Sequence, residues 1–188
     1  AAGTGSITAS DIDNGSTDAC GISSVSVTPT AFTCSNVGPN TVTLTVTDVN
    51  SLSSTCTSTV TVRDVTLPTA TCQSYTVTLD AAGTGSITAS DIDNGSTDNC
   101  TFSTSVSPNT FTCLNIAGPN TVTLTVTDAS SNSSTCTSTV TVRDVTPPTA
   151  TCQSYTVTLD AAGTGTITAA NIDNGSTDNC TFSTSVSP

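Results

Sequence analysis

Polar and apolar residues alternate over short stretches along the whole chain. Residues 121–127 read Thr-Val-Thr-Leu-Thr-Val-Thr, and residues 137–142 repeat this alternation. Strict alternation places every second side chain on the same face of an extended strand. No window of 11 residues has helical periodicity, so the pattern predicts β-strands throughout. The residues predicted to face inward on these two strands are Val122, Leu124, Val126, Val140 and Val142.

Shorter strands are predicted between clusters of turn-forming residues. Turns are expected at Asn94-Gly95, at residues 107–109 and at residues 118–120, where Gly, Pro and Asn interrupt the alternation. Six or seven short strands in about 80 residues, each with one apolar face, are typical of an all-β, immunoglobulin-like antiparallel sandwich. The shorter predicted strands cover residues 75–79, 86–89, 102–106 and 110–113.

The sequence repeats with a period of 80 residues. Ala-Ala-Gly-Thr-Gly begins at Ala1, Ala81 and Ala161, and proline-containing seams follow Arg63 and Arg143. We divide the chain into a first repeat (1–63, N-terminally truncated), a complete second repeat (64–143) and a third repeat (144–188, C-terminally truncated). We interpret it as a window from a longer tandem array with stiff connectors. The alternative is that the two ends of the sequence are simply boundaries within a short protein.

The composition excludes several functions. The chain has 188 residues, 14 acidic residues that are all Asp, two Arg and a net charge of −12. So few cations exclude the phosphate contacts of a nucleic-acid-binding protein. Without Lys or His the usual general bases and imidazole metal ligands are missing. No long apolar run predicts membrane insertion, and we do not expect an enzyme.

The cysteines predict a disulfide framework. A complete repeat has four cysteines, without His or Cys-x-x-Cys spacing, which favours disulfides over zinc. Disulfides place the protein in an extracellular or cell-surface environment. We predict Cys100–Cys113 across a short hairpin-like segment, and Cys72–Cys136 between the first and last strands. The equivalent short pair in the first repeat is Cys20–Cys34. The alternative pairs, Cys56–Cys72 and Cys136–Cys152, would cross the seams and join neighbouring repeats.

With these motifs in place, the repeat resembles the hyalin repeat, an immunoglobulin-like module of extracellular adhesive proteins. The resemblance rests on Asp-Val-Thr-Pro-Pro at 144–148, Thr-Cys at 151–152, Asp-Asn-Cys at 98–100 and the strand at 121–128. Thr-Cys at 135–136 and Val-Thr-Val at 140–142 complete it, and together these motifs cover most of each repeat. Within the family it is most similar to Thr-rich tandem forms on bacterial surface and secreted proteins. Cys113 departs from the commonest family pattern. The resemblance implies a structural, adhesive or stalk role.

An acidic loop is the main candidate for a metal-binding site. Residues 91–98 read Asp-Ile-Asp-Asn-Gly-Ser-Thr-Asp, with copies at 11–18 and 171–178. Oxygen ligands at alternate positions suit Ca²⁺, although the spacing is not that of an EF-hand. The alternative is a turn whose Asx side chains accept hydrogen bonds from their own backbone.

An immunoglobulin-like strand order would bring this loop, a linker Asp and the turn after the long strand to one repeat junction. Crowded carboxylates there would repel one another without a cation. We therefore predict structural calcium at each junction. Asn171 replaces the first Asp of the third loop and predicts a weaker site. The predicted ligands are Asp64, Asp91, Asp93, Asp98 and Asp128, with the equivalents Asp11, Asp13, Asp18, Asp48, Asp144, Asn171, Asp173 and Asp178.

The leading functional hypothesis is a structural fibre, filament or stalk of tandem sandwiches. Its expected partners are neighbouring repeats of the same chain or other copies of it. The alternative is a calcium-dependent adhesin module, with a surface glycan or protein bound through other domains. Phe32, Phe102, Phe111 and Phe182 alternate like core residues, which argues against a carbohydrate-stacking surface. An ice-binding Thr array is a weaker alternative, because sandwich sheets twist.

Overall fold

The structure is a computed structural model that describes residues 3–187; Ala1, Ala2 and Pro188, which the repeat boundaries include, lie outside this range. The residues group into two compact units. One comprises Ala1–Ala70, Gly95–Thr104 and Thr125–Thr135, and the other comprises Thr71–Asn94, Ser105–Leu124 and Cys136–Pro188. The chain is all-β with mostly antiparallel pairing, as the alternation predicts. None of the described helices has the length and apolar character needed to cross a membrane.

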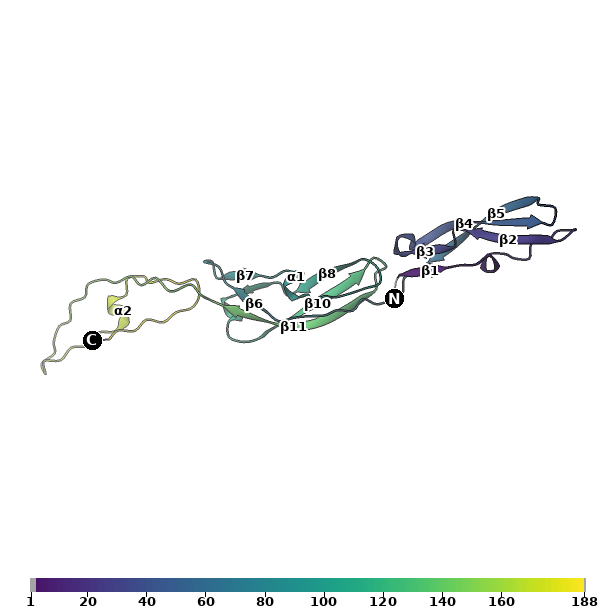
Figure 1. The fold of residues 1–188 in the computed structure, drawn as a ribbon. Coiled ribbons are helices and arrows are strands. Elements are labelled where there is room, and N and C mark those ends of the chain that lie inside the picture. Colours follow the sequence, from purple (N-terminus) through teal and green to yellow (C-terminus); the bar gives the residue numbers. More distant parts are fainter. Residues whose placement is uncertain (1–2, 188) are drawn as a thin grey trace. The chain divides into compact units, whose positions relative to one another are not determined.

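The second repeat contains two sheets (Figure 1). The larger sheet has the order β6-β11-β10-β8, and the smaller pairs β7 with β9. β6 runs parallel to β11, with Tyr75 opposite Val140. The strands are β6 (Tyr75–Thr78), β7 (Thr84–Ser86), β8 (Phe102–Ser107), β9 (Thr110–Thr112), β10 (Asn120–Asp128) and β11 (Ser133–Arg143).

The predicted alternation on the two long strands of the second repeat is confirmed. All five residues predicted to face inward are buried, while the Thr residues between them are exposed or half-buried. β-branched Thr suits the exposed side of a strand because its side chain packs well on a pleated surface and its hydroxyl stays hydrated. Phe111 of β9 is also buried, as expected, but Phe102 and Phe182 are more than a third exposed. Phe102 opens β8, which is an edge strand of the larger sheet.

The first repeat also has two sheets, but its larger sheet has three described strands and no counterpart of β6 among them. Its larger sheet has the order β2-β4-β5, and β1 pairs with β3. Phe32 from the smaller sheet packs with Val27, Val42 and Leu44 of the larger one, so the core lies between the two layers. The strands are β1 (Thr4–Ser6), β2 (Ile22–Thr28), β3 (Ala31–Thr33), β4 (Gly38–Asp48) and β5 (Ser53–Val62).

The part of the chain that the structure describes also contains five short helices. The sequence predicted a strand through residues 86–89, but β7 ends at Ser86 and a helical turn begins at Ala89. A capping box at Thr88 fixes this turn, because a local side-chain cap competes with the strand ladder. The helices are η1 (Ala9–Asp11), η2 (Cys34–Asn36), α1 (Ala89–Ile92), η3 (Cys113–Asn115) and α2 (Ala169–Ile172).

The structure contains three disulfides. Cys72–Cys136 is formed, as predicted. Cys34 pairs with Cys100, and Cys113 pairs with Cys180, with Cα–Cα distances of 5.5 Å in both. The predicted pairs Cys20–Cys34 and Cys100–Cys113 are therefore wrong, and the alternative pairs Cys56–Cys72 and Cys136–Cys152 are not formed either. Cys20, Cys56 and Cys152 are free and exposed.

Strand topology explains the wrong prediction. Cys100 precedes β8 and Cys113 follows β9, so a hairpin would have brought these two cysteines together. β8 and β9 instead belong to different sheets and are not hydrogen-bonded to each other. The same holds for β2 and β3 between Cys20 and Cys34. Cysteines that are close in the sequence are therefore not brought together by a hairpin in either repeat.

Candidate cation site beside the disulfide that joins two repeats

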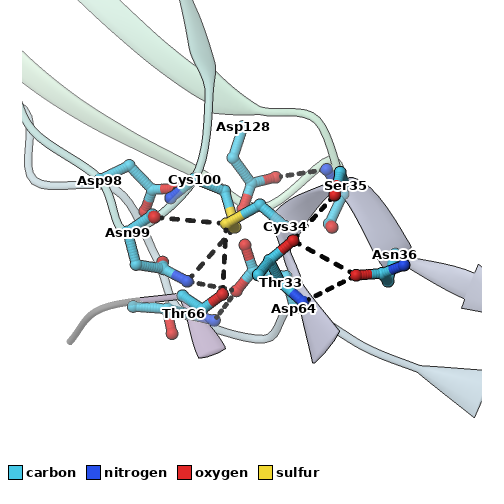
Figure 2. The surroundings of a disulfide bond; sticks show 12 residues. Thr33, Cys34, Ser35, Asn36, Asp64, Thr66, Asp98, Asn99, Cys100 and Asp128 are labelled. Carbon is cyan, nitrogen blue, oxygen red and sulfur yellow. Dashed lines mark hydrogen bonds between the residues drawn. A yellow bond between two sulfur atoms is a disulfide. The ribbon is translucent and has the colours of Figure 1, made fainter. Parts of the chain in front are cut away.

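The Cys34–Cys100 disulfide joins the first repeat to the second (Figure 2). The Cys34 sulfur lies 3.3 Å from the Asn99 backbone oxygen, a van der Waals contact because a disulfide sulfur has no proton to donate. Gly3 has a positive φ of 57° beside it, and a Cβ at this position would lie 2.5 Å from the Cys34 sulfur. Glycine is therefore required here both for backbone conformation and for close approach.

Asp64, Asp98 and Asn99 gather next to this disulfide (Figure 2). Asp64 belongs to the seam, and its Oδ1 accepts hydrogen bonds from the Thr66 backbone N–H (3.0 Å) and from Asn99 Nδ2 (3.3 Å). Asp98 Oδ2 accepts a hydrogen bond from the Cys100 backbone N–H (2.9 Å). Oxygens of the two carboxylates and the Cys100 sulfur all lie within 4.8 Å of one another.

Three oxygens at this point have no hydrogen-bond partner. They are Asp64 Oδ2, Asp98 Oδ1 and Asn99 Oδ1, and each is buried from solvent. A buried acceptor without a partner costs about 1–3 kcal/mol, and two neighbouring carboxylates add repulsion. The two carboxylates and the Asn99 amide are the kinds of oxygen ligand that Ca²⁺ prefers, and the Asp64 and Asp98 oxygens are close enough together to share one ion. The Cys100 sulfur is not a ligand because it lies in the disulfide rather than as a thiolate.

Asp128 and Asn132 support the seam from the turn between β10 and β11. Asp128 is 5 % exposed, and its Oδ1 accepts hydrogen bonds from the Ser130 and Asn132 backbone N–H groups. Burial raises the pKa of Asp128, but the bonds from Asn132 and Ser130 outweigh it and leave the pKa below its ordinary value. Asn132 Nδ2 donates to Asp128 Oδ2 (2.7 Å) and to the Asp64 backbone oxygen (3.2 Å).

Part of this arrangement recurs at the next seam, although among the described residues the close grouping of two carboxylates and a cysteine is found only at Asp64, Asp98 and Cys100. Cys113–Cys180 replaces Cys34–Cys100, and Asn179 Nδ2 donates to Asp144 Oδ1 at 3.1 Å. Asp178 Oδ1 and Asn179 Oδ1 are again buried without a partner. In the first repeat the corresponding sequence is Asp18-Ala19, which lacks the amide oxygen. Asp18 Oδ1 there accepts hydrogen bonds from the Cys20 and Gly21 backbone N–H groups.

The first acidic position of each loop has a local role instead. Asp91 Oδ2 accepts hydrogen bonds from the Thr88 backbone N–H and hydroxyl, both at 2.7 Å. These bonds hold the pKa of Asp91 below its ordinary value. Asp11 accepts the same pair of bonds from Thr8, which lowers its pKa likewise. Asn171 Oδ1 does the same for Thr168, so Asn replaces Asp here without loss of the cap.

Four other predicted ligands form hydrogen bonds with the backbone of their own turn or of an adjacent segment. Asp13 and Asp173 each accept a hydrogen bond at 3.1 Å from the backbone N–H of the Ser three residues later. The bonds from Ser176 lower the pKa of Asp173. Asp93 forms a backbone bridge with Cys72. Asp48 Oδ1 accepts bonds from two backbone N–H groups of its turn, as Asp128 does.

Of the predicted ligands, the structure therefore brings together Asp64 and Asp98. Asp128 is linked to Asp64 indirectly, because the Asn132 side chain donates hydrogen bonds to both residues. Sequence reasoning did not single out Asn99 and Asn179, whose side-chain oxygens are buried without a hydrogen-bond partner. A usable signal was present: Asn stands between Asp and Cys in the second and third repeats, and Ala replaces it in the first. This difference could be interpreted only once the disulfides were known, because the cysteine that follows each Asn bonds to the preceding repeat.

No protein family and no curated protein sequence matches the chain. Among solved structures it is similar to the protocadherin gammaB7 EC3-6 cis-dimer, with 22% identity and a TM-score of 0.29 over 65% of this chain. It is also similar to protocadherin gamma B7 extracellular cadherin domains 1–4, with 16% identity and a TM-score of 0.31 over 72%. The chain spans 36% and 45% of these two chains. Function must be argued from the site itself.

Proposed function

We propose that this protein is a structural extracellular module: a tandem array of sandwich repeats, divided at 1–63, 64–143 and 144–188, that builds a semi-rigid fibre, filament or stalk. The observation that carries the proposal is the pair of disulfides, Cys34–Cys100 and Cys113–Cys180, each joining consecutive repeats of the sequence. A covalent bond beside a proline seam limits bending between repeats.

The three disulfides also support an oxidising environment, since such bonds persist outside the cytosol. The hyalin-type assignment belongs to the same proposal. It rests on the order and spacing of the motifs at 98–100, 121–128 and 144–148.

The second part of the proposal is calcium at each seam. Asp64, Asp98 and Asn99 would hold the ion at the first seam, and Asp144, Asp178 and Asn179 at the second. Buried oxygens without hydrogen-bond partners support both sites. The ion would supply positive charge between carboxylates that otherwise repel each other, and water or backbone oxygens would complete its coordination. We expect it to stiffen the connection without any catalytic role.

Isothermal titration of the chelator-treated chain tests the calcium sites. We expect one ion per seam in the wild-type protein. Asp64→Asn or Asp98→Asn removes a charged ligand from the first seam, so each should abolish about half of the binding while the second seam still binds. Calcium should also raise the melting temperature of the wild-type protein, because it binds the folded state.

Asp18→Asn is the matched control. Asp18 corresponds to Asp98, but Ala19 follows it and its Oδ1 is already used by two backbone N–H groups. We expect calcium binding to be unchanged in this variant. A wild-type protein that takes up no calcium in the titration would remove the cation from the proposal, while the disulfide-linked array would stand.

A further inference from the structure

Only a short part of the second repeat lies between its two seam disulfides. Cys100 bonds back to Cys34, 66 residues earlier in the sequence, and Cys113 bonds forward to Cys180, 67 residues later. A covalent route from the first of these four cysteines to the last therefore needs only residues 100–113, which we name the link. The backbone route also includes all the residues that the two disulfides span.

Most of the sandwich lies off this route. Residues 35–99 hold β4, β5, β6 and β7, and residues 114–179 hold β10 and β11. Cys72–Cys136 joins these two bypassed stretches to each other. The detour through this disulfide is longer than the link, so Cys72–Cys136 stabilises the folded repeat without shortening the route from one seam to the next.

The link runs along the whole of β10, in the opposite direction. At its start, the Thr101 backbone oxygen accepts a hydrogen bond at 3.1 Å from the N–H of Ala129, the residue after β10. β8 then pairs with β10 in the larger sheet (Figure 1). Just past the end of the link, Asn115 Nδ2 donates at 3.1 Å to Oδ1 of Asn120, the first residue of β10. β10 has 9 residues at about 3.3 Å each, so the folded link covers about 30 Å.

The equivalent segment of the first repeat has the same course. β2 begins opposite Asp48, the last residue of β4. At the other end, the Asn36 backbone oxygen, two residues after Cys34, accepts a hydrogen bond at 2.6 Å from the side chain of Asn40 near the start of β4. The end-to-end course is therefore a property of the repeat and recurs in both copies.

The folded link is already close to its full extension. Its 14 residues span at most about 45 Å when the backbone is fully extended. Pulling on Cys100 and Cys113 can therefore lengthen the link by only about 15 Å. A repeat without the seam disulfides would expose all 80 residues of its period to the pull, and it could be drawn out to about 280 Å.

Both sheets and the core hold the link in place. β8 is hydrogen-bonded to β10 in the larger sheet, and β9 pairs with β7 in the smaller one, with Thr112 opposite Thr84. Phe111, within the link, is buried with 2% of its surface exposed. Strand pairing in two sheets and one buried aromatic ring therefore oppose a pull along the link.

We propose that this chain is a tension-bearing tether of nearly fixed length, in which a pull passes from repeat to repeat through the seam disulfides and the link, so that the bypassed stretches are not drawn out. This inference rests on the proposed array, because it requires both seam disulfides. It adds resistance to stretching to the resistance to bending already proposed, and it does not depend on the cation sites.

Single-molecule force spectroscopy on the oxidised 188-residue chain tests the proposal. Ser35 and Thr181 are exposed and each adjoins a seam cysteine, so azide-bearing residues at these two positions provide attachment points for the handles. The free cysteines are alkylated and EDTA is present throughout. We expect the chain to lengthen by no more than about 30 Å, which allows for the link and for reorientation of the two disulfides. After reduction, the same pull should draw out the whole backbone between the handles to about 500 Å.

Two double variants separate the route of the pull from the number of disulfides. Cys72→Ser with Cys136→Ser removes a disulfide that lies off the route, so the fully stretched length should equal that of the wild type. Cys34→Ser with Cys100→Ser removes one that lies on it. The path must then pass through Cys72–Cys136, and the stretched length should increase by about 160 Å. The covalent path alone sets both lengths, so they hold even for a variant that folds poorly.

A tryptic digest of the same oxidised sample, cut after Arg63 and Arg143, separates failure of the tether from failure of the array. If the digest shows both seam disulfides and the wild type still lengthens by more than about 30 Å, the link is folded back on itself and the tether is overturned, whereas the disulfide-linked array stands. An equal increase in length in the two double variants would also overturn the tether. Separate fragments before reduction would remove the array and the tether together.

Discussion

At the residue scale, the seams depend on positions that look unremarkable in the sequence. Asn99 and Asn179 each donate a side-chain hydrogen bond to the seam Asp and keep a buried side-chain oxygen without a partner. Gly3 and Gly83 make room for a disulfide and a backbone carbonyl. The sequence predicted that Asp64 and Asp98 lie close together, because an immunoglobulin-like strand order brings their two segments to one repeat junction. It did not single out Asn99, because Asn next to Asp is equally common in simple turns.

Gly83 and Gly163 allow a matched test of close approach. Both have positive φ, at 73° and 78°, but a Cβ on Gly83 would lie 2.7 Å from the Asn179 oxygen, whereas nothing lies within 4 Å of one on Gly163. Each Gly→Ala change should cost about 1–2 kcal/mol through backbone strain. We expect Gly83→Ala to cost more and to reduce formation of Cys113–Cys180, as measured by thermal unfolding and thiol counting. Equal losses in the two variants would contradict this account.

The hydrogen bonds of Asp80 predict that part of the stability of the fold is lost at low pH. Hydrogen bonds from the Thr84 backbone N–H and hydroxyl hold the pKa of Asp80 below its ordinary value. A carboxylate with a lowered pKa in the folded state stabilises the fold above its unfolded pKa of about 3.9, and this stabilisation is lost as the pH falls through the folded value. Asp80→Asn should therefore show a smaller fall in melting temperature than wild type between about pH 5 and pH 2. An identical fall in both proteins would exclude this contribution.

At the scale of the element, alternation was a reliable guide to the long strands and a poor one to the short segments. β10 and β11 follow their predicted faces because one side of each strand packs on the core. The turn of α1 was missed because the capping box of Thr88 and Asp91 fixes the backbone locally, and such a cap leaves no periodic signal. The pairing of β9 with β7 rather than β8 was equally invisible in the pattern.

Leu124 and Leu114 test the assigned faces directly. Leu124 of β10 is fully buried, whereas Leu114 of η3 is 91% exposed. Leu124→Ala should lower the free energy of unfolding by about 2–5 kcal/mol, because it removes buried apolar atoms and leaves a cavity. Leu114→Ala should change it by less than about 0.5 kcal/mol. Chemical denaturation measures both, and similar losses for the two variants would show that the core is wrongly placed.

At the scale of the whole molecule, the sequence predicted an all-β repeat protein held by disulfides but placed all three predicted disulfides within single repeats, and only Cys72–Cys136 is formed. A local pairing such as Cys100–Cys113 would make each repeat an independent unit. The observed pairs join one repeat to the next, so stability is shared along the chain.

The central claim is that consecutive repeats are covalently joined, and a tryptic digest of the alkylated, denatured protein tests it most directly. Cleavage after Arg63 and Arg143 would give fragments 1–63, 64–143 and 144–188. Cys34–Cys100 and Cys113–Cys180 should hold all three fragments in one species until reduction, which should then release them separately. Three separate fragments before reduction, as Cys20–Cys34 and Cys100–Cys113 would give, would contradict the account.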